Sequence, residues 1–340
     1  MKTEFGRLPD GRTAMLYTIS SGKITAKITD LGATLVQLWV PDKGGNMADV
    51  VLGYDTPQEY IDGTTFFGAT VGRNANRVAG AQFPLDGKQI QLSVNDNGVH
   101  NLHSGPNAYK NRLWEVVRHD ADSIRMRLIS PHGDQGYPGN AEIHVTYGLE
   151  QGNALYIRYD AIADRDTVFN MTNHTYFNLS GHEHPELAMG QTLSMSARHF
   201  TPDDALNIPT GELRSVEGTP FDFRKPKPIG QDIGAEYDAL ILQNGYDHNF
   251  EVFTSPCAIL CDPNSGRTMA TVTDCCGVQL YTGNFLENEP GKGGVVYTFR
   301  GGVCLETQFY PDSVNHPEWL QPFFPAGQPY HSETRYIFSW

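Results

Sequence analysis

Hydrophobic and polar residues alternate with a period of two along most of this chain. The pattern is clearest in Lys23–Thr29, Thr34–Val40, Ser123–Ile129, Glu142–Tyr147 and Leu155–Tyr159. Because neighbouring side chains of a β-strand point to opposite faces, this alternation predicts half-buried strands. Turn sequences such as Asp10-Gly11 and Asp86-Gly87 separate the strands at short, fairly even spacing. Such spacing is typical of a β-sandwich or a β-barrel.

Helical patterns are few and short. The better windows lie near Thr56–Ile61 and Gly230–Tyr237. No strand–helix–strand rhythm appears, which disfavours a doubly wound parallel sheet. No linker, charge run or fixed-period repeat marks a boundary, so residues 1–340 are expected to form a single domain. The chain is therefore predicted to be all-β with few short helices.

Three of the expected strands carry polar side chains on one face. Residues two apart on a strand share a face. These faces receive Asn170, Thr172, His174 and Tyr176 in Val168–Leu179, Gln279 and Tyr281 in Gly277–Gly283, and Glu306 and Gln308 in Gly302–Phe309. A solvated sheet face is the simpler interpretation of each strand alone, but solvated faces are usually rich in Lys, Glu, Asp and Ser. Hydrogen-bonding groups with little net charge suit a neutral polyol ligand.

Composition and charge narrow the class of partner. Lys and Arg number 25 against 39 Asp and Glu, which gives a formal net charge of −14. This charge repels nucleic-acid phosphates and anionic lipid headgroups at long range. The N-terminal residues lack the apolar run of a signal peptide, and no stretch of about 18 apolar residues offers a membrane span. We expect a globular cytoplasmic protein that binds neither nucleic acid nor membranes.

Cysteine usage and glycosylation motifs agree with that location. The five cysteines are an odd number in a long chain, which is not the pattern of a disulfide-stapled secreted domain. The adjacent Cys275 and Cys276 are expected to be buried residues without a thiol role. Asn170, Asn173 and Asn178 each begin a glycosylation sequon within one expected strand. If that strand carries a site, the chain suits a cytosol or a bacterium better than a secretory pathway.

Metal and nucleotide sites are weaker interpretations of the remaining motifs. His100 and His103 lie three residues apart, and His182 and His184 follow His174. The chain nevertheless contains neither HExxH nor paired CxxC motifs, so a zinc site is not favoured. The glycine-flanked segment 72–80 lacks the spacing of a nucleotide-binding loop. Neither a metal site nor a nucleotide site is therefore favoured.

Eight ordered segments closely resemble the aldose 1-epimerase family, also called galactose mutarotases. They are Gly72–Gly80, Asn101–Gly105, Trp114, Ser130–Gly139, Asn173–Leu179, Tyr246–His248, Gly277–Phe285 and Leu305–Asp312. The resemblance spans nearly the whole chain. It implies a large, twisted, antiparallel β-sandwich of the galactose mutarotase type. It also implies an open site on one sheet and no cofactor.

The resemblance further implies roles for individual residues. His174 corresponds to the proton donor of the family and Glu306 to its general base. Contacts to sugar hydroxyls carry over to Asn76, Arg77, His103, Asp247 and Gln279, with Tyr176 as a wall of the site. Ser104 stands where the family usually has glycine, which leaves the shape of the loop beside His103 open.

The implied reaction opens a hemiacetal, for which two proton-transfer groups suffice. Near neutral pH an unperturbed Glu (about 4.3) is ionised, whereas an unperturbed His (about 6.5) is mostly neutral. We therefore expect the carboxylates of Glu306 and Asp247 to favour the imidazolium form of His174. The pH dependence of kcat/KM is predicted to be bell-shaped.

Two other functions are compatible with the same fold. One is a non-catalytic sugar-binding or regulatory module, and the other is a mutarotase of hexose 6-phosphates. The latter would need additional Arg or Lys at the rim of the site to pair with a phosphate dianion. A glycosidase would need two carboxylates, and the strands offer a Glu and a His as the clearest pair. The expected substrate is a free aldohexose such as galactose or glucose, and the expected state is a monomer or a homodimer.

Overall fold

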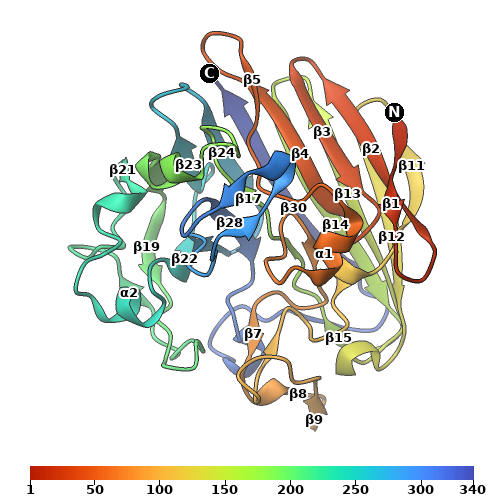
Figure 1. Ribbon diagram of the computed structural model, residues 1–340. Coiled ribbons are helices and arrows are strands. Elements are labelled where there is room, and N and C mark those ends of the chain that lie inside the picture. The colour runs from red at the N-terminus through yellow and green to blue at the C-terminus, as the bar shows by residue number, and fades with distance from the viewer.

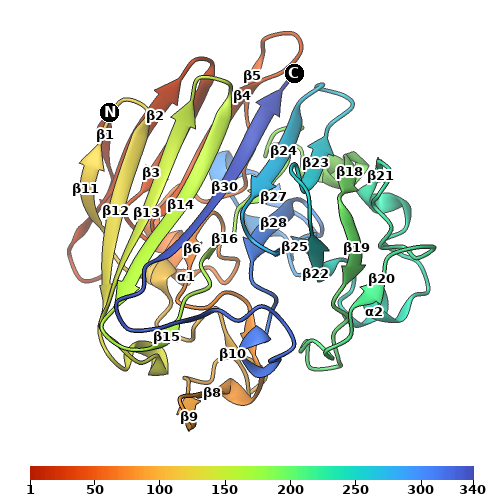
Figure 2. The same cartoon turned by 180° about the vertical axis from the view of Figure 1, so that it is seen from behind.

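The computed structural model describes residues 1–340, and most of its regular structure is β-strand. The largest sheet has nine strands, and each neighbouring pair is antiparallel. In spatial order they are β11 (Glu115–His119), β12 (Ser123–Ser130), β13 (Ala141–Glu150), β14 (Ala154–Ala163), β30 (Tyr330–Ser339), β24 (Thr268–Thr273), β23 (Ala258–Cys261), β18 (Thr192–Met195) and β21 (Lys227–Pro228). Figure 2 shows this sheet from behind as one broad, twisted layer.

Two smaller sheets form the second layer, in front of the first in Figure 1. The five-stranded sheet consists of β1 (Lys2–Arg7), β2 (Thr13–Ser21), β3 (Ile24–Thr29), β4 (Thr34–Pro41) and β5 (Met47–Asp49). The six-stranded sheet consists, in order, of β17 (Tyr176–Phe177), β28 (Val303–Gln308), β25 (Gly277–Tyr281), β22 (Asp247–Val252), β19 (Ala197–Phe200) and β20 (Arg214–Ser215). The predicted all-β antiparallel sandwich is confirmed, with a second layer that is divided into two hydrogen-bonded sheets.

Short strand pairs and helices connect these sheets. The pairs are β6 (Thr70–Val71) with β16 (Thr172–Asn173), β7 (Arg77–Val78) with β10 (Asn101–Leu102), β8 (Gln82–Leu85) with β9 (Lys88–Gln91), β15 (Thr167–Val168) with β29 (Phe323–Phe324), and β26 (Glu289–Pro290) with β27 (Val296–Tyr297). The α-helices are α1 (Pro57–Asp62) and α2 (Asp238–Leu242). The 3-10 helices are Ala79–Ala81, Tyr109–Asn111, Asp134–Gly136, Pro185–Gly190, Ile229–Gln231, Lys292–Gly294 and Ser313–Asn315.

The helix predictions were correct at one window and wrong at the other. At α1, Thr56 and Glu59 form a capping box that closes the first turn. The window 230–237 contains the end of a 3-10 turn, and α2 begins only at Asp238. Gly230 and Gly234 fall inside this window, and glycine is unfavourable in a helix interior. The helix therefore begins after them.

The core lies between the two layers and follows the alternation of the sequence. In β13, Ile143, Val145 and Tyr147 are buried, whereas the residues between them are partly exposed. A cluster of 55 buried residues draws from all three sheets. The hydroxyl of Tyr336 in β30 donates to the carbonyl of Leu305 in β28 at 3.1 Å, which joins the layers through the core.

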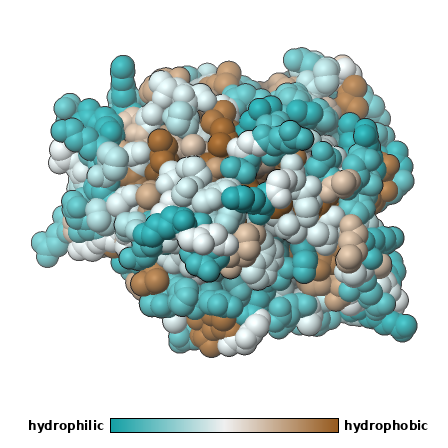
Figure 3. Space-filling model, turned by 90° about the horizontal axis from the view of Figure 1, so that it is seen from above, coloured by the Kyte–Doolittle hydropathy of each residue, from teal (hydrophilic) through white to brown (hydrophobic).

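The outer surface agrees with the polar composition. The face shown in Figure 3 is mostly hydrophilic, and its apolar residues form small separate patches. None of the helices has the length and apolar character that crossing a lipid bilayer requires.

Candidate active site

His174 lies where the chain changes its pairing partner. The segment 168–179 was predicted as one strand, but it is divided into β15, β16 and β17. Strand β16 pairs with β6, and β17 pairs with β28. Between them the N–H of His174 donates to the carbonyl of Ala69 at 3.0 Å, and its carbonyl accepts from the N–H of Gly68 at 2.9 Å. These hydrogen bonds fix the backbone of His174 between β16 and β17.

Glu306 is placed by the centre of the six-stranded sheet. Its strand, β28, lies between β17 and β25, so its backbone is hydrogen-bonded on both sides. Val303 and Leu305 of the same strand point into the core, and Glu306 points to the opposite face, as the alternation predicts. The carboxyl is buried, and its Oε2 has no hydrogen-bond partner within the protein. A buried polar atom of this kind needs a partner from outside the chain, such as a water molecule or a ligand hydroxyl.

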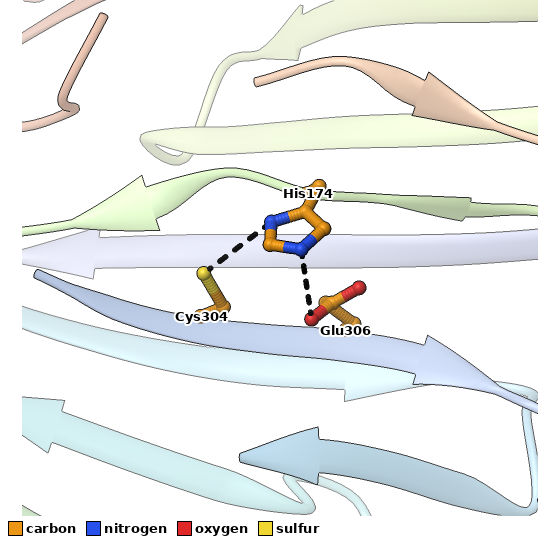
Figure 4. Close-up of side chains that lie close together, drawn as sticks. All are labelled: His174, Cys304 and Glu306. Carbon is orange, nitrogen blue, oxygen red and sulfur yellow. Dashed lines mark hydrogen bonds and ion pairs between the residues drawn. The ribbon is translucent and has the colours of Figure 1, made fainter. Parts of the chain in front are cut away.

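The imidazole of His174 stands between a thiol and a carboxyl (Figure 4). Its Nε2 is 3.7 Å from Oε1 of Glu306, and its Nδ1 is 3.7 Å from Sγ of Cys304. Ligand atoms of these three residues lie within 4.8 Å of one another, and together they are the group in this site that could hold a metal ion. The two ring nitrogens face different partners, however, and one ion can bind only one of them. The orientation therefore suits proton transfer better than metal coordination.

Except for Gln279, every predicted site residue lines a single cavity of about 170 Å³. The lining consists of Thr64, Thr65, Phe66, Asn76, Arg77, Leu102, His103, His174, Tyr176, Asp247, Tyr281, Phe285, Leu286 and Glu306. Residues from β7, β10, β17, β22, β25 and β28 and from the loop after α1 thus meet around one space.

Gln279 lies next to the lining residue Asp247. Its Nε2 donates to Oδ1 of Asp247 at 2.8 Å, and its exposed fraction of 3% is similar to the 2% of Glu306. It is not among the residues that line the cavity. A direct contact between Gln279 and a sugar stays a prediction.

Aromatic rings form much of the wall. The ring of His174 stacks on Tyr176 at 5.1 Å and meets the edge of Tyr281 at 6.1 Å. The hydroxyl of Tyr176 donates to a backbone carbonyl at 2.9 Å, so this residue offers its ring rather than its hydroxyl. Phe66 lies 4.9 Å from the ring of His103, and Phe285 at the rim is 59% exposed. Sequence reasoning missed Phe66 and Phe285, since both lie in irregular segments without an alternating pattern.

The loop that carries His103 is fixed by hydrogen bonds to residues 74–76. The N–H of Asn76 donates to Nδ1 of His103 at 3.2 Å, which leaves Nε2 as the protonated nitrogen of the neutral ring. Ser104 has φ of 69°, in the region that favours glycine. Its hydroxyl compensates by accepting from the N–H of Asn74 at 2.8 Å and donating to its carbonyl at 3.1 Å. Serine is thus accommodated without displacing His103 from the cavity.

Two charged residues complete the polar lining. Nε of Arg77 donates to Oδ2 of Asp96 at 2.9 Å, so the guanidinium is held in place with its terminal nitrogens free for a ligand. Burial raises the pKa of Asp247, while Arg77 and Gln279 partly offset this effect. The lining therefore combines one guanidinium, two carboxyls and two imidazoles in a small, partly apolar space.

Burial also determines the protonation of the central pair. It lowers the pKa of His174 to about 4. It raises the pKa of Glu306 well above its usual value, and the charge of Asp247 adds to that shift. The carboxylates were predicted to favour imidazolium at His174, but the pKa of the ring is lowered instead, because desolvation outweighs their attraction. The imidazole is therefore neutral at neutral pH, and burial favours the protonated form of the neighbouring carboxyl.

Comparison with known proteins agrees with this geometry. The family model for aldose 1-epimerase matches residues 15–337. A galactose mutarotase of Sus scrofa is 39% identical over 99% of this chain and 98% of its own length. An aldose 1-epimerase of Escherichia coli (strain K12) is 36% identical over 97% and 96% of the two chains.

Solved structures show the same relationship. An aldose epimerase homologue from C. elegans superposes with a TM-score of 0.88 at 33% identity, covering 96% of this chain and 99% of the other. A galactose 1-epimerase from Lactobacillus acidophilus gives a TM-score of 0.87 at 26% identity, covering 100% of this chain and 98% of the other. The chain therefore belongs to the aldose 1-epimerase family of isomerases.

Proposed function

We propose that this protein interconverts the α and β anomers of a free aldohexose, with His174 as proton donor and Glu306 as general base. The observation that supports this most strongly is the placement of Nε2 of His174 and Oε1 of Glu306, 3.7 Å apart at the wall of one cavity. The close pair of an imidazole and a carboxyl speaks against a non-catalytic sugar-binding module, because binding alone would not require two proton-transfer groups side by side.

The reaction needs two proton transfers. Glu306 removes the proton from the C1 hydroxyl, the bond between C1 and the ring oxygen breaks, and His174 protonates that oxygen. The product is the open-chain aldehyde. After rotation about the C1–C2 bond the same steps run in reverse, and the ring closes to the other anomer. Positioned acid–base groups each contribute typically 10²–10⁴-fold to such a rate.

The reaction needs an imidazolium at His174 and a carboxylate at Glu306. This charge state forms from a neutral imidazole and a protonated carboxyl when a single proton moves from Glu306 to His174. A neutral imidazole with a protonated carboxyl contains the same number of protons as an imidazolium with a carboxylate. When the hydroxyls of a bound sugar donate to Glu306, the carboxylate form is stabilised and the proton passes to His174. The pair therefore holds one proton before and after ring opening, because Glu306 gains the proton of the C1 hydroxyl as His174 releases its own to the ring oxygen.

The lining favours a free sugar over a sugar phosphate. Arg77 is its single Lys or Arg residue, and it is already paired with Asp96. Asp247 and Glu306 add negative charge when ionised, which would repel a phosphate dianion. The aromatic rings offer flat surfaces for the C–H faces of a sugar, and His103, Asn76 and Asp247 supply hydrogen bonds to its hydroxyls.

A cytoplasmic location is part of the same proposal. All five cysteines are unpaired, which suits a reducing compartment. The side-chain amides of Asn173 and Asn178 are buried and donate to the carbonyls of Gly68 and His184. A glycan on either amide would disrupt these contacts, so a compartment without N-glycosylation fits them better. Whether the chain is a monomer or a homodimer stays a prediction.

Polarimetry on freshly dissolved sugars tests the proposal. The rate above the spontaneous one is measured for α-glucose, α-galactose, xylose, arabinose and glucose 6-phosphate. We expect acceleration with at least one free aldose and a much smaller kcat/KM for glucose 6-phosphate. Acceleration of the phosphate alone would indicate the phosphate-specific activity. No acceleration of any sugar, combined with measurable binding, would indicate a sugar-binding module.

A further inference from the structure

Cys304 is a buried thiol that no step of the proposed reaction uses. It lies on β28 two residues before Glu306, on the same face of the strand, and pairs with Tyr176 of β17. Its Sγ is 3.7 Å from Nδ1 of His174, within the range of a hydrogen bond to sulfur. The other ring nitrogen faces Glu306, so the imidazole contacts both side chains of β28 (Figure 4).

The position of the proton on the imidazole ring decides whether Nε2 of His174 can accept a proton from Glu306. Nε2 faces the carboxyl of Glu306 and the cavity, so it is the nitrogen that must take up and release a proton. A neutral imidazole carries one N–H, and Nε2 is free to accept only if that N–H is on Nδ1. With the proton on Nε2 instead, Glu306 could not transfer its own proton to the ring without a second rearrangement.

We propose that Cys304 is a positioning residue whose sulfur accepts the Nδ1–H of His174 and thereby keeps Nε2 as the working nitrogen. The catalytic consequence rests on the proposed function, whereas the position of the proton does not. Histidines at functional sites are usually oriented by a carboxylate or a backbone carbonyl. A neutral thiol is a weaker acceptor, so it orients the ring without adding a negative charge that would stabilise imidazolium.

The protonation states of the three groups agree with this arrangement. Burial raises the pKa of the Cys304 thiol well above its usual value, and the charges of Glu306 and Asp247 raise it further. The sulfur therefore stays neutral. The low pKa of His174, about 4, keeps the ring neutral as well, so one ring nitrogen is unprotonated at pH 7. Cys304 is the hydrogen-bond partner of Nδ1, and this contact selects the tautomer.

Nitrogen NMR of the full-length protein tests the inference directly. In protein labelled with ¹⁵N-histidine, the shifts at pH 7 distinguish protonated from unprotonated ring nitrogens, and His174→Asn identifies the signals of this residue. We expect His174 to carry its proton on Nδ1. Cys304→Ala should shift the population toward Nε2–H and lower kcat about tenfold with little change in KM. Cys304→Ser, whose hydroxyl accepts, should restore the Nδ1–H form and much of the turnover.

Cys257→Ala is the matched control. Cys257 is also a buried cysteine, and it donates to a backbone carbonyl of β24 at 3.2 Å. The control should leave both the tautomer of His174 and kcat unchanged. A wild-type ring with its proton on Nε2, or an unchanged tautomer in Cys304→Ala, would overturn the inference. An Nδ1–H tautomer in a protein that accelerates no aldose would contradict the proposed function and support the assignment to Cys304.

Discussion

Burial, more than neighbouring charge, decides how the side chains of the site hold their protons. His174 and Glu306 are both almost inaccessible to solvent. Isolated charges are costly in such a place, so the pKa of the imidazole falls and the pKa of the carboxyl rises. We therefore expect the two groups to act as one unit that shares an exchangeable proton. The pH dependence of activity should therefore follow the titration of this pair.

The pH profile of kcat/KM should be a broad bell. Activity is lost on the acid side when a second proton enters the pair, near the pKa of about 4 of His174. It is lost on the alkaline side when the shared proton leaves, above the ordinary range of a glutamic acid. Polarimetric rates from pH 4 to 10 measure both limits. An acid limit near 6.5, the ordinary value of histidine, would show that burial does not lower this pKa.

Glu306→Gln should stabilise the fold at neutral pH while it abolishes the proposed base. Because the pKa of Glu306 is raised in the folded state, its contribution to stability is complete below its unfolded value near 4.5. That contribution is lost as pH rises through the folded pKa. The free energy of unfolding of the variant should therefore increase relative to wild type as pH rises, by at most about 1.4 kcal/mol per pH unit.

Urea denaturation between pH 4 and 8 measures this difference. Glu186→Gln is a suitable control, because that carboxyl is exposed and lies outside the cavity. The control should show no comparable dependence on pH. Equal stabilities of wild type and Glu306→Gln across the range would contradict the burial argument.

At the scale of strands and loops, the alternation of the sequence predicted on which face of a strand a side chain lies, but not which side chains of different strands touch. It placed Glu306 and Tyr281 on the correct side of their strands. Cys304 lies two positions before Glu306 and therefore shares its face, but no role was predicted for it. The pattern could not show that Gln279 donates to Asp247, because register between strands far apart in sequence does not follow from local alternation.

The same limit explains the interrupted strand 168–179. Its residues alternate as in a single strand, but they pair in turn with β29, β6 and β28. Which strands pair depends on the tertiary structure, and a local sequence pattern does not encode it. The family resemblance identified His174 without this knowledge, whereas the reason for its fixed position lies in the backbone bonds to Gly68 and Ala69.

Gly68→Ala should therefore impair both folding and turnover. Gly68 has φ of 63°, and an added Cβ would lie 2.0 Å from the carbonyl oxygen of Leu35. The clash and the strained backbone together should cost about 3 kcal/mol or more, and kcat should fall because Gly68 holds the carbonyl of His174. Thermal denaturation and polarimetry measure the two effects.

Gly87→Ala separates strain from collision. Gly87 has φ of 70°, but nothing lies within 4 Å of the added Cβ. Gly87→Ala should lower the free energy of unfolding only by the strain of the left-handed backbone, about 1–2 kcal/mol, and should leave kcat unchanged. Similar losses in both variants would mean that the contact with Leu35 is unimportant.

At the scale of the whole molecule, a buried ion pair joins the five-stranded sheet to the segment between β26 and β27. Nζ of Lys292 donates to Oδ2 of Asp49 at 2.5 Å and to the carbonyls of Val36 and Val51 at 2.8 and 2.7 Å. Both charged groups are nearly inaccessible. All donors of the ammonium group are thus used, and the pair fixes this segment against the sheet.

Lys292→Met should destabilise the protein by about 3–5 kcal/mol, because it leaves the carboxyl of Asp49 buried without a partner. The double variant Asp49→Asn with Lys292→Met removes both charges and should recover a large part of that loss. Urea denaturation of the single and double variants provides the comparison. A double variant that is less stable than Lys292→Met would show that the pair itself, rather than the unpaired charge, determines the effect.

Polarimetry of wild type, Glu306→Gln and His174→Asn tests the central claim most directly. Each variant keeps the approximate shape of the side chain and loses its ability to exchange the proton. On a free aldose that the wild type accelerates, we expect both variants to fold and bind the sugar but to lose at least about 10²-fold in kcat. Turnover near the wild-type rate in either variant would contradict the assignment of His174 and Glu306 as the acid–base pair.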